Sequence, residues 1–181
     1  GRVVYERRLI TLNFGCGYPV NDWPAIFSEI LRKFHGKIGK LIFDDDPQYY
    51  YIGRMTVSDY NRACMLGTFT VTVEADPYKY ELTAGDEDWL WDPLDLEEGV
   101  IREYGNIEVS GEYAMIIDGT EKWIIPEITV SADMTVAFEG KQYSLKAGTN
   151  KVYDIVIKEG ENMLTFHGTG TVSVKYRGAI L

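Results

Sequence analysis

Three consecutive acidic residues, Asp44, Asp45 and Asp46, are the first side chains in this sequence that could do chemistry. A calcium ion needs about six to eight converging oxygen ligands, and the spaced D-x-[DN]-x-[DN]-G loop that supplies them does not occur here. Consecutive acids directly before Pro47 are more typical of a solvated turn between strands. We therefore expect neither a metal site nor a cofactor at this triplet.

Nucleophilic chemistry would have to use the two cysteines, Cys16 and Cys64, or the two histidines, His35 and His167. A Cys–His pair needs hydrogen-bond contact and a third, orienting group, and no nucleophile signature flanks either cysteine. His35 is expected in the last turn of a helix, where a cation is favoured. The run His167-Gly168-Thr169-Gly170 is followed by a strand pattern, so it indicates a hairpin turn and not a phosphate loop. The sequence predicts no catalytic residue and no enzyme activity.

Aromatic side chains suggest a different kind of chemistry, because Trp and Tyr can stack on sugar rings. Tyr113 and Trp123 are candidates of this type in the C-terminal half. Packing in a core or an interface is the commoner use of such residues. A carbohydrate-binding β-sandwich that recognises host-surface glycans is therefore the alternative function that the sequence leaves open.

The charge is unevenly distributed along the 181 residues. Residues 76–108 carry eleven acidic and two basic side chains, whereas the stretches on either side are nearly balanced, and the formal net charge is −10. Binding to a phosphate backbone needs clustered Lys and Arg, so we expect no nucleic-acid partner. The sequence also has no apolar run of about 18 residues and no signal peptide, so no membrane association is expected.

The N-terminal half has the patterns of a sheet covered by one helix. Residues 3–14 alternate as a half-buried strand, and an apolar stripe at helical spacing predicts a helix over residues 23–34, capped ahead of Pro24 and ended by Gly36. Residues 41–43 and 49–52 form a predicted hairpin around the acidic turn. A linker through Asp59 and Asn61 and a strand over residues 64–75 follow, which makes an α+β unit.

The C-terminal half has no helical period. Short apolar runs recur every eight to twelve residues between Gly-containing turns, which is typical of a small antiparallel sandwich. The expected strands are 107–110, 113–117, 122–130, 135–138, 142–145, 151–157, 163–166 and 171–176.

The chain is thus expected to have three parts. Residues 1–80 form an N-terminal β-rich α+β domain, residues 81–106 an acidic connecting arm, and residues 107–181 a C-terminal antiparallel β-sandwich. The arm contains Trp89 and Trp91, and such large apolar groups are costly to leave in water. We therefore expect the arm to pack onto its own domain or onto a partner.

In the order and spacing of its motifs, the sequence resembles the distal tail (Dit) proteins of phages and prophages with long non-contractile tails. The similarity covers nearly the whole chain. It rests on RRLITL at residues 7–12, the helix at 23–34, LIFDDDPQYYYIGRM at 41–55, FTVTVEADPYKY at 69–80, IIPEITV at 124–130, VAFEGKQYSL at 136–145 and the last 23 residues, 159–181.

The resemblance implies a mainly β fold with one helix, in which a ring-forming N-terminal domain precedes a galectin-like sandwich. It implies a structural protein of the virion tail tip, assembled in the host cytoplasm, that forms a homo-hexameric ring. The ring would be a baseplate hub that joins the tail tube protein to tip proteins and receptor-binding proteins. Members of the family carry further residues before the first strand, so we expect native sequence upstream of Gly1.

The residue types and the resemblance to distal tail proteins together indicate candidate subunit contacts. Tyr and Trp are enriched at protein interfaces, and an aromatic-rich hairpin together with sheet edges is suited to contacts with neighbouring copies. The candidates are Asp44, Asp45, Asp46, Tyr49, Tyr50, Tyr51, Trp89 and Trp91.

Overall fold

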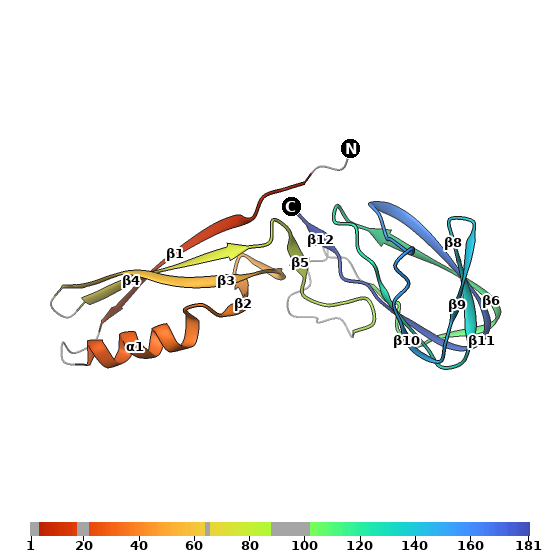
Figure 1. Cartoon of the computed structure of the whole chain (residues 1–181), viewed down its shortest axis with the longest axis horizontal. Coiled ribbons are helices and arrows are strands. Elements are labelled where there is room, and N and C mark those ends of the chain that lie inside the picture. Colours follow the sequence, from red (N-terminus) through yellow and green to blue (C-terminus); the bar gives the residue numbers. More distant parts are fainter. Residues whose placement is uncertain (1–3, 18–21, 64–65, 88–101) are drawn as a thin grey trace. The chain divides into compact units, whose positions relative to one another are not determined.

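A computed structural model describes residues 4–17, 22–63, 66–87 and 102–181. The described chain is mainly β with a single helix, as the sequence predicts (Figure 1). It divides into two compact units. Unit 1 comprises residues 1–43 and 50–79, and unit 2 comprises residues 44–49 and 80–181. The centre of the expected acidic arm, residues 88–101, lies outside the described residues.

Unit 1 is an antiparallel sheet with one helix against it. Strand β4 pairs on one side with β1 and on the other with β3, and β2 pairs with β3. The register sets Val71 of β4 between Leu12 of β1 and Val57 of β3. The elements are β1 (Arg8–Gly17), α1 (Trp23–Phe34), β2 (Ile38–Phe43), β3 (Asp46–Ala63) and β4 (Leu66–Ala75).

Helix α1 spans the predicted residues, but its N-terminal end differs from expectation. Asp22 is the N-cap residue, yet its side chain makes no capping hydrogen bond. His35 is the C-cap in an extended conformation, and its Nδ1 accepts a hydrogen bond of 3.1 Å from the backbone N–H of Val57. His35 thus directly follows the last turn of α1, where it was expected to lie, and its ring contacts the backbone of β3. Gly36 follows with a φ of 75°, the left-handed conformation that ends many helices.

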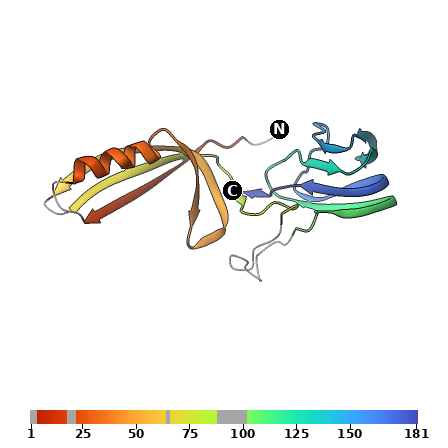
Figure 2. The ribbon, with the colours of Figure 1, turned by 90° about the horizontal axis from the view of Figure 1, so that it is seen from below.

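The core of unit 1 lies between α1 and the sheet. Seen from below, α1 lies across one face of the sheet (Figure 2). Phe27, Ile30 and Leu31 of the helix pack against buried Val71 and Val73 of β4. At the start of the helix the ring of fully buried Trp23 lies directly over Gly67, where a Cβ atom would collide with it.

The predicted linker through Asp59 and Asn61 is instead part of β3. The register between β3 and β4 shifts between Ser58 and Asn61, which marks a β-bulge, and Asp59 has a φ of 53°. Polar residues that are typical of loops also suit a bulge, so the local pattern did not separate the two. The turn between β2 and β3 is at Asp44 and Asp45, as predicted.

Unit 2 is a β-sandwich organised around one long strand, β11. Its strand order is β10-β7-β11-β8-β9, and β6 also pairs with β11 along 13 residues. Residues 46–49 of β3, strand β5 and strand β12 form a second set of pairs. The elements are β5 (Lys79–Glu81), β6 (Ile107–Gly119), β7 (Glu127–Val130), β8 (Met134–Phe138), β9 (Lys141–Leu145), β10 (Gly148–Asn150), β11 (Gly160–Lys175) and β12 (Ala179–Ile180).

Two predicted pairs of short strands are single long strands in unit 2. Residues 107–117 are continuous in β6 through Gly111, and residues 163–175 are continuous in β11 through Gly168 and Gly170. The hairpin turn expected at Gly168 is therefore wrong. Conversely, the expected strands 122–130 and 151–157 shorten to β7 and an isolated bridge between Ile124 and Ile157.

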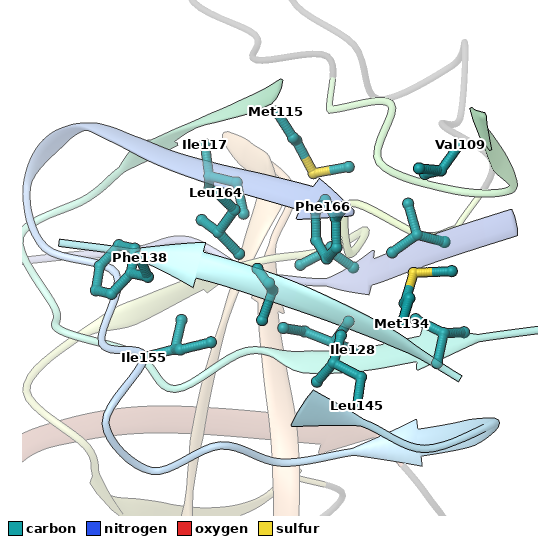
Figure 3. Close-up of a cluster of buried hydrophobic side chains, with 14 of the residues drawn as sticks. Val109, Met115, Ile117, Ile128, Met134, Phe138, Leu145, Ile155, Leu164 and Phe166 are labelled. Atoms are coloured by element: carbon teal, nitrogen blue, oxygen red, sulfur yellow. The ribbon is translucent and has the colours of Figure 1, made fainter. Parts of the chain in front are cut away.

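The core of unit 2 fills the space between its strands (Figure 3). Sixteen buried apolar residues form one cluster, and Ile117, Leu164 and Phe166 are fully buried within it. Side chains from β6, β7, β8, β9 and β11 all contribute to this cluster. At about 1.5–3 kcal/mol for each large buried side chain, such burial is the main source of stability in this unit.

Candidate interaction surfaces

The acidic triplet lies at the turn between β2 and β3. Asp44 and Asp45 are exposed, whereas Asp46 begins β3 and is half-buried. Among the described residues, no group of three or more His, Cys, Asp or Glu side chains is arranged to hold a metal ion. The two exposed carboxylates are therefore available to solvent or to another protein.

The three tyrosines after the turn are engaged to different degrees. Tyr50 is buried, 7% exposed, and the Lys40 ammonium lies 4.2 Å from the centre of its ring. The Tyr51 hydroxyl accepts a 2.8 Å hydrogen bond from Arg8. Tyr49 is half-buried. The Lys40–Tyr50 and Arg8–Tyr51 contacts thus lie within unit 1, while Trp89 and Trp91 lie outside the described residues.

The sheet face opposite α1 carries a largely polar surface, including Arg54 and Glu74, that sequence reasoning did not single out. Alternation along a strand sends successive side chains to opposite faces, so the face away from the core holds hydroxyl and amide groups. The register brings Thr11, Thr72 and Thr56 into one row across three strands, and Thr70 donates a 3.0 Å hydrogen bond to Asn13 in the next row.

Strand β1 forms one side of this sheet. In the described part of the chain it pairs only with β4, so the opposite edge of its ten residues presents backbone donors and acceptors. Leu9 and Phe14 on this strand are 69% and 42% exposed. A long edge strand with exposed apolar side chains is the kind of surface that pairs with another chain.

An apolar groove of about 350 Å³ opens on the α1 side of unit 1. It lies between the end of α1, strand β2 and the sheet, and its walls include Phe14, Phe34, Leu41 and Met55. Lys40 is the charged residue in its lining, and no acidic residue lines it among the described residues. We call this feature the α1–β2 groove. The helical period in the sequence predicted the buried stripe but not the part of the sheet that the helix leaves uncovered.

A buried ion pair organises the region of unit 2 next to the acidic segment. Glu81 accepts two 2.8 Å hydrogen bonds from Arg102 and a third of 2.9 Å from the backbone N–H of Gly178. Burial alone would lower the pKa of Arg102, but the hydrogen bonds and the charge of Glu81 outweigh it and raise that pKa above its ordinary value. A side chain at position 178 would collide with the Glu81 carboxylate, which explains the glycine.

The two ends of the stretch 86–103 meet at this network. The backbone N–H of Tyr104 donates a 2.7 Å hydrogen bond to the carbonyl of Gly85. Beside it, Arg177 donates a 3.0 Å hydrogen bond to Glu87. The pKa of Glu87 is lowered by the backbone N–H of Ala84 first and by Arg177. The described residues on either side of 88–101 are therefore hydrogen-bonded within the same part of unit 2.

Comparison with known proteins gives a similarity to a solved structure. No protein-family model and no curated protein sequence matches the chain. The crystal structure of the Dit protein (gp 19.1) of phage SPP1 superposes with a TM-score of 0.56. The match covers 98% of this chain and 81% of the SPP1 protein, at 13% sequence identity. The chain has the Dit fold. The SPP1 protein is described as a paradigm of the hub adsorption apparatus in phages that infect Gram-positive bacteria.

The two aromatic residues that suggested sugar binding are both partly exposed in the structure. Trp123 is 44% exposed, with the Lys158 ammonium 5.9 Å from its ring centre, and Tyr113 on β6 is 37% exposed. Both belong to unit 2, the sandwich of this Dit fold.

Among the described helices, none is long and apolar enough to cross a membrane.

Proposed function

We propose that this protein is a structural component of a phage or prophage tail tip, where copies form a hub ring between the tail tube and the tip or baseplate proteins. The observation that carries the proposal is the similarity to the SPP1 hub protein over 98% of the chain, which includes both units. Fold and function can separate, so surface features must support the assignment.

The surface of unit 1 supports assembly. A ring needs a heterologous contact that repeats from copy to copy and closes. Strand β1 offers a ten-residue edge for such a contact, and the sheet presents a flat polar face beside it. Backbone hydrogen bonds across a strand edge give affinity, and the exposed side chains of Leu9 and Phe14 add apolar area.

The finer assignments belong to the same proposal. The ring contains six copies and performs no reaction, and its partners are the tail tube protein, a tail-tip protein and receptor-binding proteins. The protein is assembled in the host cytoplasm and resides at the virion tail tip. Asp44, Asp45 and Asp46, the tyrosines at 49–51, and Trp89 with Trp91 contribute subunit contacts.

The direct test is the mass of the full-length gene product in solution, combined with particle imaging. We expect closed rings at micromolar concentration. Replacing Leu9 by Lys on the exposed edge should weaken ring formation about tenfold, because it removes apolar contact area and places a charge in each repeated contact.

The matched control is Lys141→Glu on β9, an exposed change of charge in unit 2 that should leave assembly unchanged. A full-length protein that stays monomeric at high concentration and shows no rings would contradict the proposal. Equal loss of assembly in both variants would remove β1 as the contact.

A further inference from the structure

The α1–β2 groove has the form of a binding site for an apolar side chain. Its walls combine helix, strand and sheet, and two of its aromatic residues, Phe14 and Phe34, remain 42% and 40% exposed. Phe14 is held in place by a stacked contact with Phe69, whose ring centre is 5.1 Å away. A groove of about 350 Å³ is within the range of sites that hold a small apolar group.

The chain around this groove is basic. Residues 30–43 contain Arg32, Lys33, Lys37 and Lys40 and no acidic residue. Lys40 lines the groove, and its ammonium is positioned over the ring of Tyr50. Arg32 and Lys33 lie in the last turn of α1 and both pair with Glu29, at 3.9 and 2.9 Å, so Lys37 and Lys40 are the cations on which the charge argument rests. An occupant should therefore combine large apolar side chains with negative charge.

One segment of the chain has this composition. Residues 88–98 read DWLWDPLDLEE and contain five acidic residues, five large apolar residues and no basic residue. The flanking positions Gly85 and Tyr104 are hydrogen-bonded to each other in unit 2. A stretch of this length that returns to its base can extend at most about 30 Å from it, which is enough to contact a neighbouring molecule.

We propose that residues 88–98 of one copy bind the α1–β2 groove of a second copy, with Trp89 or Trp91 as the apolar anchor and the surrounding acids facing Lys37 and Lys40. Charge complementarity selects this occupant over other apolar segments. The inference rests on the proposed hub function for the second copy, because a ring places each copy against a neighbour.

Binding is tested first with a labelled peptide of residues 86–99. The receptor is the full chain carrying Trp89→Ser and Trp91→Ser, so that its own segments do not compete, and fluorescence anisotropy reports the complex. The same two substitutions in the peptide should weaken binding about thirtyfold or more, because buried tryptophan area is lost. Absence of binding by the unaltered peptide overturns the inference.

Receptor variants then locate the site. Lys40→Glu should weaken binding up to about fivefold, with the effect reduced in high salt, and Phe34→Ser should weaken it about tenfold. The matched controls are Lys141→Glu and Tyr153→Ser, which change an exposed charge and an exposed aromatic ring in unit 2. Equal losses in controls and groove variants overturn the assignment to the groove.

Photo-cross-linking identifies which copy supplies the segment. Benzoylphenylalanine replaces Trp91, and light and ¹⁵N-labelled copies are mixed before irradiation. We expect mixed-isotope cross-links to peptides that contain Phe34 or Leu41. Cross-links confined to single copies, or to other peptides, overturn the inference. Ring formation is measured on the same sample, so intact rings without groove cross-links refute this inference alone, whereas an absence of rings refutes the hub function.

Discussion

The buried ion pair between Arg102 and Glu81 holds together the part of unit 2 that adjoins the acidic segment. Their side chains are only 5% and 13% exposed, and Arg102 also donates a 2.6 Å hydrogen bond to the carbonyl of Asp118. The guanidinium group lies 5.0 Å from the centre of the Tyr176 ring. Each member is satisfied only while the other is present, because neither charge is solvated.

Removal of one member should therefore be costly. We expect Arg102→Met to lower the free energy of unfolding of unit 2 by about 3–5 kcal/mol, because it leaves the Glu81 carboxylate buried without its cation. Urea titration followed by hydrogen exchange in β11 measures this change. Lys146→Met is the control: Lys146 pairs with Asp133 through side chains that are 80% and 60% exposed, so the loss should stay below about 1 kcal/mol.

A double variant, Arg102→Met with Glu81→Leu, should recover much of the loss, since no uncompensated charge remains. If Arg102→Met costs no more than Lys146→Met, the buried pair contributes nothing beyond a surface pair and this account is wrong.

Side-chain contacts between residues far apart in the sequence, such as the Arg102–Glu81 pair, were the features that the sequence predicted least. The helical stripe indicated that Trp23 is buried, but not that Gly67 receives its ring. Glu81 and Arg102 are 21 residues apart with an acidic segment between them, and no local pattern connects them. The edge of β1 and the α1–β2 groove were missed for the same reason, since both depend on which strands become neighbours.

Among the elements, β11 shows why strand boundaries were predicted poorly. Its residues 165–167 pair with β8 and its residues 172–175 pair with β7, while β6 accompanies it along most of its length. Gly168 and Gly170 lie between the two pairings with φ of 147° and 146°. Glycines at such a place bend the strand from one partner to the next. In the sequence alone, these glycines indicated a hairpin turn, because glycine is typical both of turns and of bends within strands.

A side chain at this bend should be poorly tolerated. A Cβ at position 168 would lie 2.7 Å from Cβ of Met134, and the positive φ disfavours any residue other than glycine. We expect Gly168→Ala to destabilise unit 2 by about 2 kcal/mol or more, measured by urea unfolding.

Thr169→Ala is the matched control, because this exposed residue sits between the two glycines and should change stability by less than about 0.5 kcal/mol. Similar midpoints for the two variants would mean that the bend does not need glycine.

By contrast, α1 and the alternating strands of unit 1 followed from sequence alone. The spacing of apolar residues within one segment is enough to predict which face of that segment is buried. The helix stripe from Trp23 to Leu31 is buried or half-buried, although its last member, Phe34, is exposed, and the alternation across residues 66–75 matches the buried pattern of β4. The bulge at Asp59 was not predicted, because polar residues of this kind are typical of loops as well as of bulges.

At the scale of the whole molecule, the two units have cores of different size. Among the described residues, the cluster in unit 2 contains sixteen buried apolar side chains, whereas the cluster in unit 1 contains five. Local opening is easier where few apolar contacts must be broken. The units therefore need not unfold together.

We expect backbone amides of β11 to exchange at least about tenfold more slowly than those of β1, at a concentration where the protein is monomeric. Hydrogen exchange with mass spectrometry of peptides 160–175 and 8–17 measures this difference. Equal protection would indicate that the two units open as one.

The position of β11 in the chain also bears on biosynthesis. Strands β6, β7 and β8 all pair with a strand that begins at Gly160, so they have no partner in that strand until the ribosome has made residues 160–175. The strands of unit 1 are complete by Ala75 and can pair while translation continues. The sandwich must therefore close later in synthesis than the sheet of unit 1, and until β11 has been made its apolar strands depend on rapid pairing, or on a chaperone, to avoid aggregation.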